Sequence, residues 1–353
     1  MSEEQPSGRA APALDRTAVS AVDAGGMLDD VLGQPHQLED ALWRVDAAGI
    51  EPVDAPGGVV VCGMGGSAIG ADLAGGAIGD RARRPLVTSR DYAPPSWVSD
   101  DTLVLCASYS GDTEETLAAY AAAGERGAAR VVMTTGGELA EAARADGVPV
   151  IGVPSGMQPR AAVAYMTVGA LEVAALAGVT DSLRSEVEAA SVLLRELAAE
   201  WGPDGDAQCE PKALARALQG QVPVVYGAEL TAPVSVRWRS QLNENAETPA
   251  FDGVLPEMDH NAICGWGQPT FTAIFLDDDE QHARVMRRIE LSADVVAAAG
   301  SPVERVRSRG KTRTERVLSL VLLGDLVSLY LAVLNGVDPT PVARIDDFKQ
   351  RLG

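Results

Sequence analysis

The sequence predicts an α/β protein with two domains in tandem, each built around a doubly wound parallel sheet. Its 353 residues exceed the usual size of one hydrophobic core, and an apolar content of 46% is enough for two cores. Apolar, β-branched runs alternate with alanine-rich helical stretches, as they do in repeated βα units. In the first half of the chain these runs lie at residues 59–62, 85–89, 102–108, 130–135 and 148–153.

The second half repeats the pattern. Strand-like runs at 222–227, 271–277 and 301–308 alternate with helical stretches, and a long apolar helix at 316–336 precedes a short terminal helix. Composition and breaker residues divide the chain into four expected segments. They are a disordered tail at 1–17, a first domain at 18–178, a charged helical linker at 179–210 and a second domain at 211–353.

Composition limits the class of partner. The net charge is −21, whereas nucleic acids and anionic membranes are bound by lysine and arginine, so neither is an expected partner. Four scattered cysteines and three histidines show no metal-ligand spacing, so no metal site is expected. No uninterrupted apolar run reaches the ~20 residues of a membrane span, and the N-terminus lacks the apolar core of a signal peptide. We therefore expect a cytoplasmic protein.

The stretch VVVCGMGGSAIG, residues 59–70, runs from a strand into a glycine cluster that opens a helix, an arrangement that binds anions. Two kinds of ligand are compatible with it. Gly63, Gly65 and Ala68 satisfy the loose dinucleotide pattern G-x-G-x-x-G/A. A phosphate ester would instead need several hydroxyl and amide donors close together.

A second loop, ASYSGDTEET at residues 107–116, favours the phosphate ester. It also leaves an apolar strand and enters a helix, and it carries Ser108, Ser110 and Thr113. Because ligands bind at the carboxyl ends of the strands in a doubly wound sheet, we expect these hydroxyls to converge with that of Ser67. The alternative is that residues 110–113 only cap a helix.

These two loops, GMGGSAIGAD followed by SYSGDTEET, resemble the sugar isomerase (SIS) domain. The later stretches RWRSQLNENAETPAFDGVLPEMDHNAICGW and DPTPVARIDDFKQRL resemble the bifunctional phosphoglucose/phosphomannose isomerase family. The resemblance covers nearly the whole chain after residue 20. It implies two SIS domains of flavodoxin-like topology, and an aldose-ketose isomerase that acts as a homodimer without metal or nucleotide cofactor.

The resemblance also implies roles for particular residues. The phosphate and sugar would be bound by Gly65, Gly66, Ser67, Ser108, Ser110 and Thr113, and Arg160 would lie beside the reacting carbons. Glu244 in NENA matches the base that transfers the proton, His260 in MDHN matches the ring-opening histidine, and Lys349 matches a catalytic lysine. His260 is further implied to reach the site of the neighbouring subunit.

The assigned groups suit this chemistry. Moving a carbonyl between C1 and C2 requires a base that transfers a proton between the two carbons, and a partly desolvated carboxylate can do so. An imidazole and an amine suit ring opening, and a guanidinium suits the enediolate that follows. Each residue also has an ordinary alternative: Glu244 on a solvated helix face, His260 in a loop, Lys349 on a terminal helix, and Arg160 in an ion pair.

A second functional class stays open at this point, because SIS domains also occur in noncatalytic proteins that bind sugar phosphates. Such a protein could lack the base, the histidine and the lysine, whereas all three match here. The chain departs from the family pattern at Glu247, where lysine is usual, and at Ala262, where glutamate is usual. Neither position is among the assigned catalytic groups, and both bear on substrate preference and efficiency.

Overall fold

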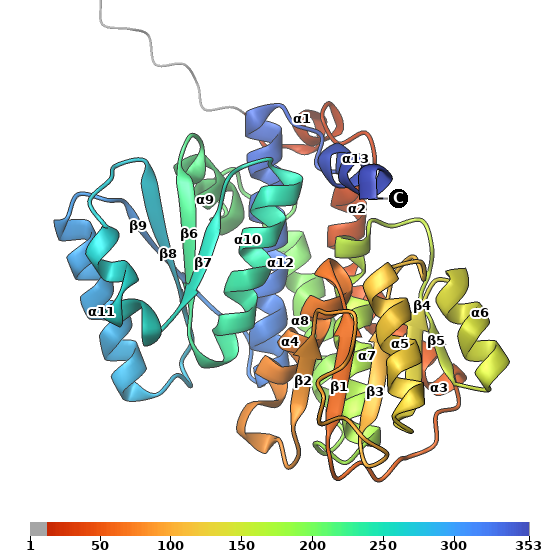
Figure 1. Cartoon of the computed structure of the whole chain (residues 1–353). Helices are drawn as coiled ribbons and strands as arrows, with labels where there is room; N and C mark the ends of the chain where they lie inside the picture. The colour runs from red at the N-terminus through yellow and green to blue at the C-terminus, as the bar shows by residue number, and fades with distance from the viewer. Residues whose placement is uncertain (1–12, 353) are drawn as a thin grey trace, which may run out of the picture.

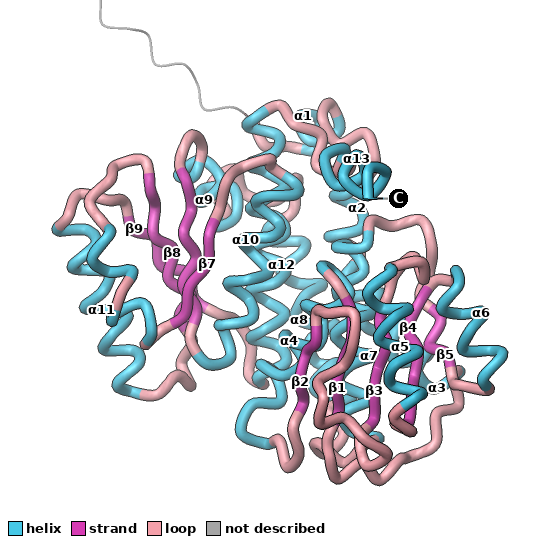
Figure 2. Tube along the Cα trace, viewed as in Figure 1, coloured by secondary structure: helices cyan, strands magenta, loops and turns pink. Residues whose placement is uncertain are grey.

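Residues 13–352 are described by the computed structural model, and they form two parallel sheets separated by a layer of helices (Figure 1 and Figure 2). Residues 1–12 of the expected tail lie outside the described part. The expected disorder does not hold for residues 13–17, because Leu14 is buried and helix α1 begins at Arg16.

The first half contains a five-stranded parallel sheet. Its strands are β1 (Val59–Gly63), β2 (Leu86–Ser89), β3 (Leu103–Ala107), β4 (Ala129–Thr134) and β5 (Val150–Gly152). Its helices are α1 (Arg16–Ser20), α2 (Met27–Leu32), α3 (Gln34–Ala47), α4 (Gly65–Ile78), η1 (Gly79–Arg81), α5 (Glu114–Glu125), α6 (Gly137–Asp146), η2 (Pro159–Ala162) and α7 (Val163–Leu176). All five predicted strands of this half are confirmed.

The strand order of this sheet is β2-β1-β3-β4-β5, with every neighbouring pair parallel. The chain places β2 on one side of β1 and then crosses to place β3 on the other side. The direction in which strands are added therefore reverses between β1 and β3, although all strands stay parallel. In doubly wound sheets the ligand site lies at this switch point, outside the carboxyl ends of the strands. The loop after Gly63 and the loop after Ala107 both begin there.

The second half contains a four-stranded parallel sheet of order β7-β6-β8-β9. Its strands are β6 (Val222–Gly227), β7 (Phe251–Val254), β8 (Phe271–Asp277) and β9 (Val303–Arg307). The accompanying helices are α8 (Arg184–Trp201), α9 (Glu210–Leu218), η3 (Glu229–Thr231), α10 (Ala232–Asn245), η4 (Glu257–His260), η5 (Ala262–Gly265), α11 (Ala283–Ala298), α12 (Arg313–Asn335) and α13 (Ala343–Leu352). The sequence did not predict β7, because this edge strand is largely exposed and has no apolar alternation.

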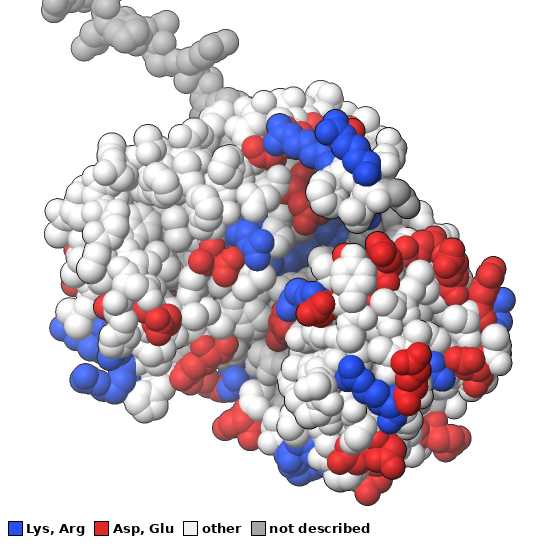
Figure 3. All heavy atoms as spheres, viewed as in Figure 1, with Lys and Arg blue, Asp and Glu red and all other residues white. Residues whose placement is uncertain are grey.

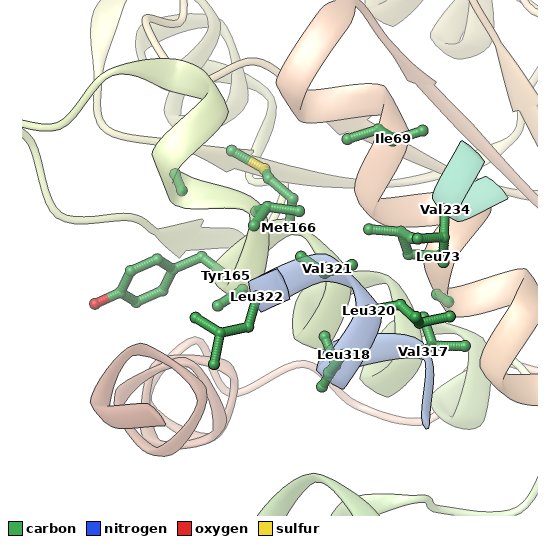
Figure 4. Packing of buried hydrophobic residues seen from close by; sticks show 14 of the residues in the cluster. Ile69, Leu73, Tyr165, Met166, Val234, Val317, Leu318, Leu320, Val321 and Leu322 are labelled. Atoms are coloured by element: carbon green, nitrogen blue, oxygen red, sulfur yellow. The ribbon is translucent and has the colours of Figure 1, made fainter. Parts of the chain in front are cut away.

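One hydrophobic core joins the two halves. It combines the inner faces of both sheets with the helices between them, among which α12 is buried over residues 314–332. Leu73 of α4 and Val234 of α10 lie together beside Val317 and Leu320 of α12 (Figure 4). Two smaller clusters lie under α5 and α6 on the outer face of the first sheet and under α11 on the outer face of the second.

Helix α12 is long and apolar enough to cross a membrane by length and composition. However, 89% of its apolar window is buried inside the fold, as expected for the central helix of a large core. It is the only such helix among residues 13–352.

Helices α4 and α10 run antiparallel, and this arrangement positions the candidate site. At one end, a Cβ added to Gly76 near the end of α4 would lie 3.0 Å from the ring of Pro233 at the start of α10. At the other end, the last turn of α10 shares a cavity with Gly65 and Gly66 at the start of α4. Residues at the end of α10 are therefore held against the glycine loop that follows β1.

The contact between α12 and α10 generates a stability prediction. A side chain at Gly324 of α12 would overlap the indole ring of Trp238, whose Nε1 donates to the carbonyl of Leu320 at 2.8 Å. Gly324→Ala should therefore lower the free energy of unfolding by about 1–3 kcal/mol, measured by chemical denaturation. Gly75 of α4 is the matched control, because its Cβ would point into open space. Gly75→Ala should stabilise the protein by about 0.5–1 kcal/mol, and equal effects of the two substitutions would contradict this packing.

Candidate active site

The two predicted loops meet at the switch point of the first sheet. Ser67, in the first turn of α4, accepts a hydrogen bond at its Oγ from the backbone N–H of Tyr109 at 3.1 Å. Tyr109 is buried, and its hydroxyl donates to the carbonyl of Pro154 at 3.0 Å and accepts from the N–H of Met157 at 2.9 Å. The loop after β1, the loop after β3 and the segment before η2 are thus joined by hydrogen bonds.

The hydroxyls of the second loop also gather. Ser108 Oγ lies 2.7 Å from Thr113 Oγ1 and accepts from the N–H of Gly111 at 3.1 Å. Ser110 is exposed, and its Oγ accepts from the N–H of Asp112 at 3.2 Å. Thr113 occupies the N-cap position of α5, yet its side chain makes no capping hydrogen bond to that helix. Helix capping alone therefore does not account for the hydroxyl of Thr113.

Glycine is required at the start of α4 for two different reasons. Gly65 has a φ of +48°, in the left-handed region that glycine tolerates best. A Cβ added to Gly66 would lie 2.8 Å from the carbonyl oxygen of Pro159 and 2.9 Å from the Cα of Arg160. Any side chain at position 66 would therefore push η2, and Arg160 with it, away from the loop.

Arg160 is 3% exposed, and its guanidinium donates hydrogen bonds to two distant parts of the chain, α10 and the segment before α13. Nε donates to Oδ1 of Asn245 at 2.6 Å, and Nη2 donates to the carbonyls of Pro339 and Thr340 at 2.6 and 2.8 Å. Burial lowers the pKa of Arg160 because it disfavours the charged form, and the nearby carboxylate of Glu244 opposes this shift. The hydrogen bonds to α10 and to the C-terminal segment compensate for the lost hydration.

A buried ion pair lies behind Arg160. Arg237 donates from Nε and Nη2 to the two carboxylate oxygens of Asp325 at 3.0 and 2.9 Å, and Nη2 also donates to the carbonyl of Arg160 at 2.8 Å. Gln34 donates to Asp325 at 2.7 Å. Because Arg237 and Asp325 are both buried, removing either one would leave the charge of the other uncompensated. The pair therefore fixes the main chain at Arg160.

Glu244 faces Arg160 from the last turn of α10. Its Oε2 lies 3.7 Å from Nη1 of Arg160, and its side chain is 29% exposed. Both line a cavity of about 30 Å³ between α4, η2 and α10. Four further residues of its lining are Gly65, Gly66, Arg237 and Gln241. A carboxylate, a guanidinium and the glycine loop are thus brought together although they lie far apart in the sequence.

Comparison with known proteins adds an independent observation. A family model described as "Bacterial phospho-glucose isomerase C-terminal SIS domain" matches residues 207–352. A bifunctional phosphoglucose/phosphomannose isomerase of Caldicellulosiruptor bescii is 37% identical over 335 residues, covering 92% of this chain and 98% of the relative. One from Aquifex aeolicus is 36% identical and covers 84% of this chain and 90% of the relative.

The chain belongs to the bifunctional phosphoglucose/phosphomannose isomerase family. The fold agrees with this membership. A solved structure of a hypothetical protein from Thermus thermophilus matches with a TM-score of 0.74 at 16% identity, covering 96% of this chain and 93% of that one. This chain therefore has the predicted architecture of two parallel α/β sheets in tandem, and its second half matches a SIS domain.

Neither His260 nor Lys349 is among the residues that line the cavity between Glu244 and Arg160. His260 is exposed at the end of η4, in the loop region between β7 and β8. Lys349 is exposed on α13, the terminal helix. The start of α13 nevertheless reaches Glu244, because residues 341–345 and Glu244 line a second cavity of about 220 Å³.

The two departures from the family pattern are both exposed. Glu247 follows α10 and has its carboxylate 3.4 Å from Nη2 of Arg344 on α13. Ala262 begins η5.

On the face shown in Figure 3, Lys and Arg side chains lie in the hollow between the two halves, while acidic side chains are spread over much of the surrounding surface. Over residues 13–352, no group of three or more His, Cys, Asp or Glu side chains is placed to hold a metal ion.

The sequence did not identify the groups that hold Arg160, which are Asn245, Arg237 and Asp325. Helical spacing offers a partial signal, since Arg237 and Glu244 are seven residues apart on α10 and share a face. No comparable signal points to Asp325 on α12, whose contact with Arg237 spans 88 residues.

Proposed function

We propose that this isomerase family member interconverts glucose 6-phosphate and mannose 6-phosphate with fructose 6-phosphate through a cis-enediol intermediate. The observation that carries the proposal is the 3.7 Å separation between Glu244 and Arg160 in a cavity bordered by the glycine loop. Glu244 takes a proton from C2 of the open-chain aldose and returns it to C1. Arg160 stabilises the negative charge of the enediolate.

The phosphate of the substrate is proposed to bind at the switch point of the first sheet. Gly65, Gly66 and Ser67 contribute the start of α4, and Ser108, Ser110 and Thr113 contribute the loop before α5. Backbone N–H groups at helix N-termini and short hydroxyl side chains bind a phosphate without requiring lysine or arginine. Phosphate binding of this kind suits a chain whose net charge is −21. We further propose that the protein works in the cytoplasm.

Ring opening is assigned to His260 and Lys349. Because His260 lies on exposed η4, away from the cavity of its own chain, we propose that it acts in the site of a second copy, in a homodimer. Lys349 lies on α13, whose first residues border Glu244.

Replacing the base tests the assignment of Glu244. Glu244→Gln keeps the shape of the side chain but removes its basicity, so kcat should fall at least about a hundredfold for both aldoses. Substrate binding should change little. The measurement is a parallel isomerase assay with glucose 6-phosphate and mannose 6-phosphate in the presence of EDTA, together with a binding titration. The control is Glu196→Gln, which changes an exposed carboxylate on α8 that lines neither cavity and should leave kcat unchanged. Normal turnover by Glu244→Gln would show that another group is the base.

Mixing two inactive variants tests the shared site. In a heterodimer of Glu244→Gln and His260→Ala, one of the two sites would receive an intact Glu244 from one subunit and an intact His260 from the other. With random exchange and twofold symmetry, about a quarter of wild-type activity should return. The assay follows activity after subunit exchange, which mass spectrometry can verify. Complete exchange without recovered activity would mean that each site uses its own His260.

A further inference from the structure

Gln241 is a buried polar side chain whose amide oxygen is left unsatisfied. It lies on α10 and is 1% exposed. Its Oε1 has no hydrogen-bond partner within residues 13–352. Buried amide oxygens in folded proteins nearly always accept a hydrogen bond, so an unsatisfied one requires an explanation.

The other polar side chains on this face of α10 already have partners. Ser240 donates its hydroxyl to the carbonyl of Val236 at 3.0 Å. Arg237 pairs with Asp325, and Glu244 lies beside Arg160. Gln241 differs from these neighbours, because its acceptor is directed to no group of the described chain. Packing of α10 alone therefore does not explain a glutamine at this position.

The unsatisfied group borders the cavity that contains the proposed base. Gln241 precedes Glu244 by three residues, so the two side chains lie on the same helix face one turn apart. Both line the cavity with Gly66 and Arg160, and its volume of about 30 Å³ corresponds to roughly one water molecule or one hydroxyl group. A ligand that binds at the glycine loop and reacts at Glu244 would pass beside Gln241.

We propose that Gln241 is a substrate-binding residue whose Oε1 accepts a hydrogen bond from a hydroxyl of the hexose 6-phosphate chain. The phosphate of a hexose 6-phosphate that has lost both protons offers only acceptor oxygens and cannot satisfy this atom, whereas every sugar hydroxyl is a donor. The hydrogen bond orients the carbon chain between the phosphate loop and Glu244. The assignment rests on the proposed function and extends it to the recognition of the sugar.

The test uses Gln241→Met in the full-length chain. Methionine has nearly the shape of glutamine without its polar atoms, and it removes an unsatisfied buried group, so the melting temperature should stay the same or rise. Binding of an equilibrated mixture of hexose 6-phosphates, measured by calorimetric titration, should weaken about tenfold to a hundredfold. Binding of inorganic phosphate should not change, and kcat/KM should fall in parallel with hexose phosphate binding.

Gln37→Met is the matched control. Gln37 is a buried glutamine on α3 whose Oε1 likewise lacks a partner in the described chain, and it is not among the residues that line the cavity. Its hexose phosphate affinity and kcat/KM should stay within about twofold of wild type, although its melting temperature should fall because Nε2 donates to the carbonyl of Asp30 at 2.8 Å.

Three results would overturn the assignment. Unchanged hexose phosphate binding in Gln241→Met would show that the amide does not contact the sugar. Equal weakening for inorganic phosphate would place its role at the phosphate instead. A lower melting temperature with unchanged kcat/KM would indicate a purely structural role. If the wild-type protein binds hexose 6-phosphates without turning them over, the proposed function fails, and the titration still decides the role of Gln241.

Discussion

The buried guanidinium of Arg160 is the group on which the rest of the site depends. Removing a charge from water is costly, so it persists in the interior only where the fold supplies matched acceptors. Here they are the amide oxygen of Asn245 and the carbonyls of Pro339 and Thr340. They belong to α10 and to the segment between α12 and α13. The guanidinium therefore joins parts of the chain that lie far apart in the sequence. Both halves must be folded before all of its hydrogen bonds can form.

The same network determines where the carboxylate lies. Asn245 is the next residue after Glu244, so the hydrogen bond that holds Arg160 also holds the last turn of α10. Antiparallel packing of α4 against α10 brings that turn to the glycine loop, and the missing side chain of Gly66 lets η2 approach. A carboxylate and a fixed cation thus lie beside the glycine loop, an arrangement that suits the proposed proton transfer.

The sequence predicted most of the fold because its signals are local. Strands such as β1 and β3 are continuous apolar runs that lead into a glycine-rich or serine-containing loop, and buried parallel strands have this composition. β7 was missed because Phe251 and Val254, at the two ends of this edge strand, are exposed and give no alternation. The tail was overestimated because a single buried residue, Leu14, leaves no periodic pattern.

The site was only partly predictable for the opposite reason. Residues in recognisable motifs, such as Ser67, Ser108 and Glu244, could be chosen from the sequence. Their mutual placement depends on contacts between distant segments, among them Arg160 with Asn245 over 85 residues and Arg237 with Asp325 over 88. Gln241 could have been suspected from its place one helical turn before Glu244. That its oxygen lacks a partner among residues 13–352 is visible only in three dimensions.

Glu244 and Arg160 are proposed to carry a proton transfer through an enediol. The most direct test of this step is to incubate the full-length protein with fructose 6-phosphate in D₂O and to measure deuterium at C2 of the aldose products by NMR. We expect deuterium at C2 of both glucose 6-phosphate and mannose 6-phosphate, because a carboxylate that holds the proton exchanges it with solvent. Aldose products formed without any deuterium at C2, even after prolonged incubation, would indicate a direct hydride shift instead of proton transfer by Glu244.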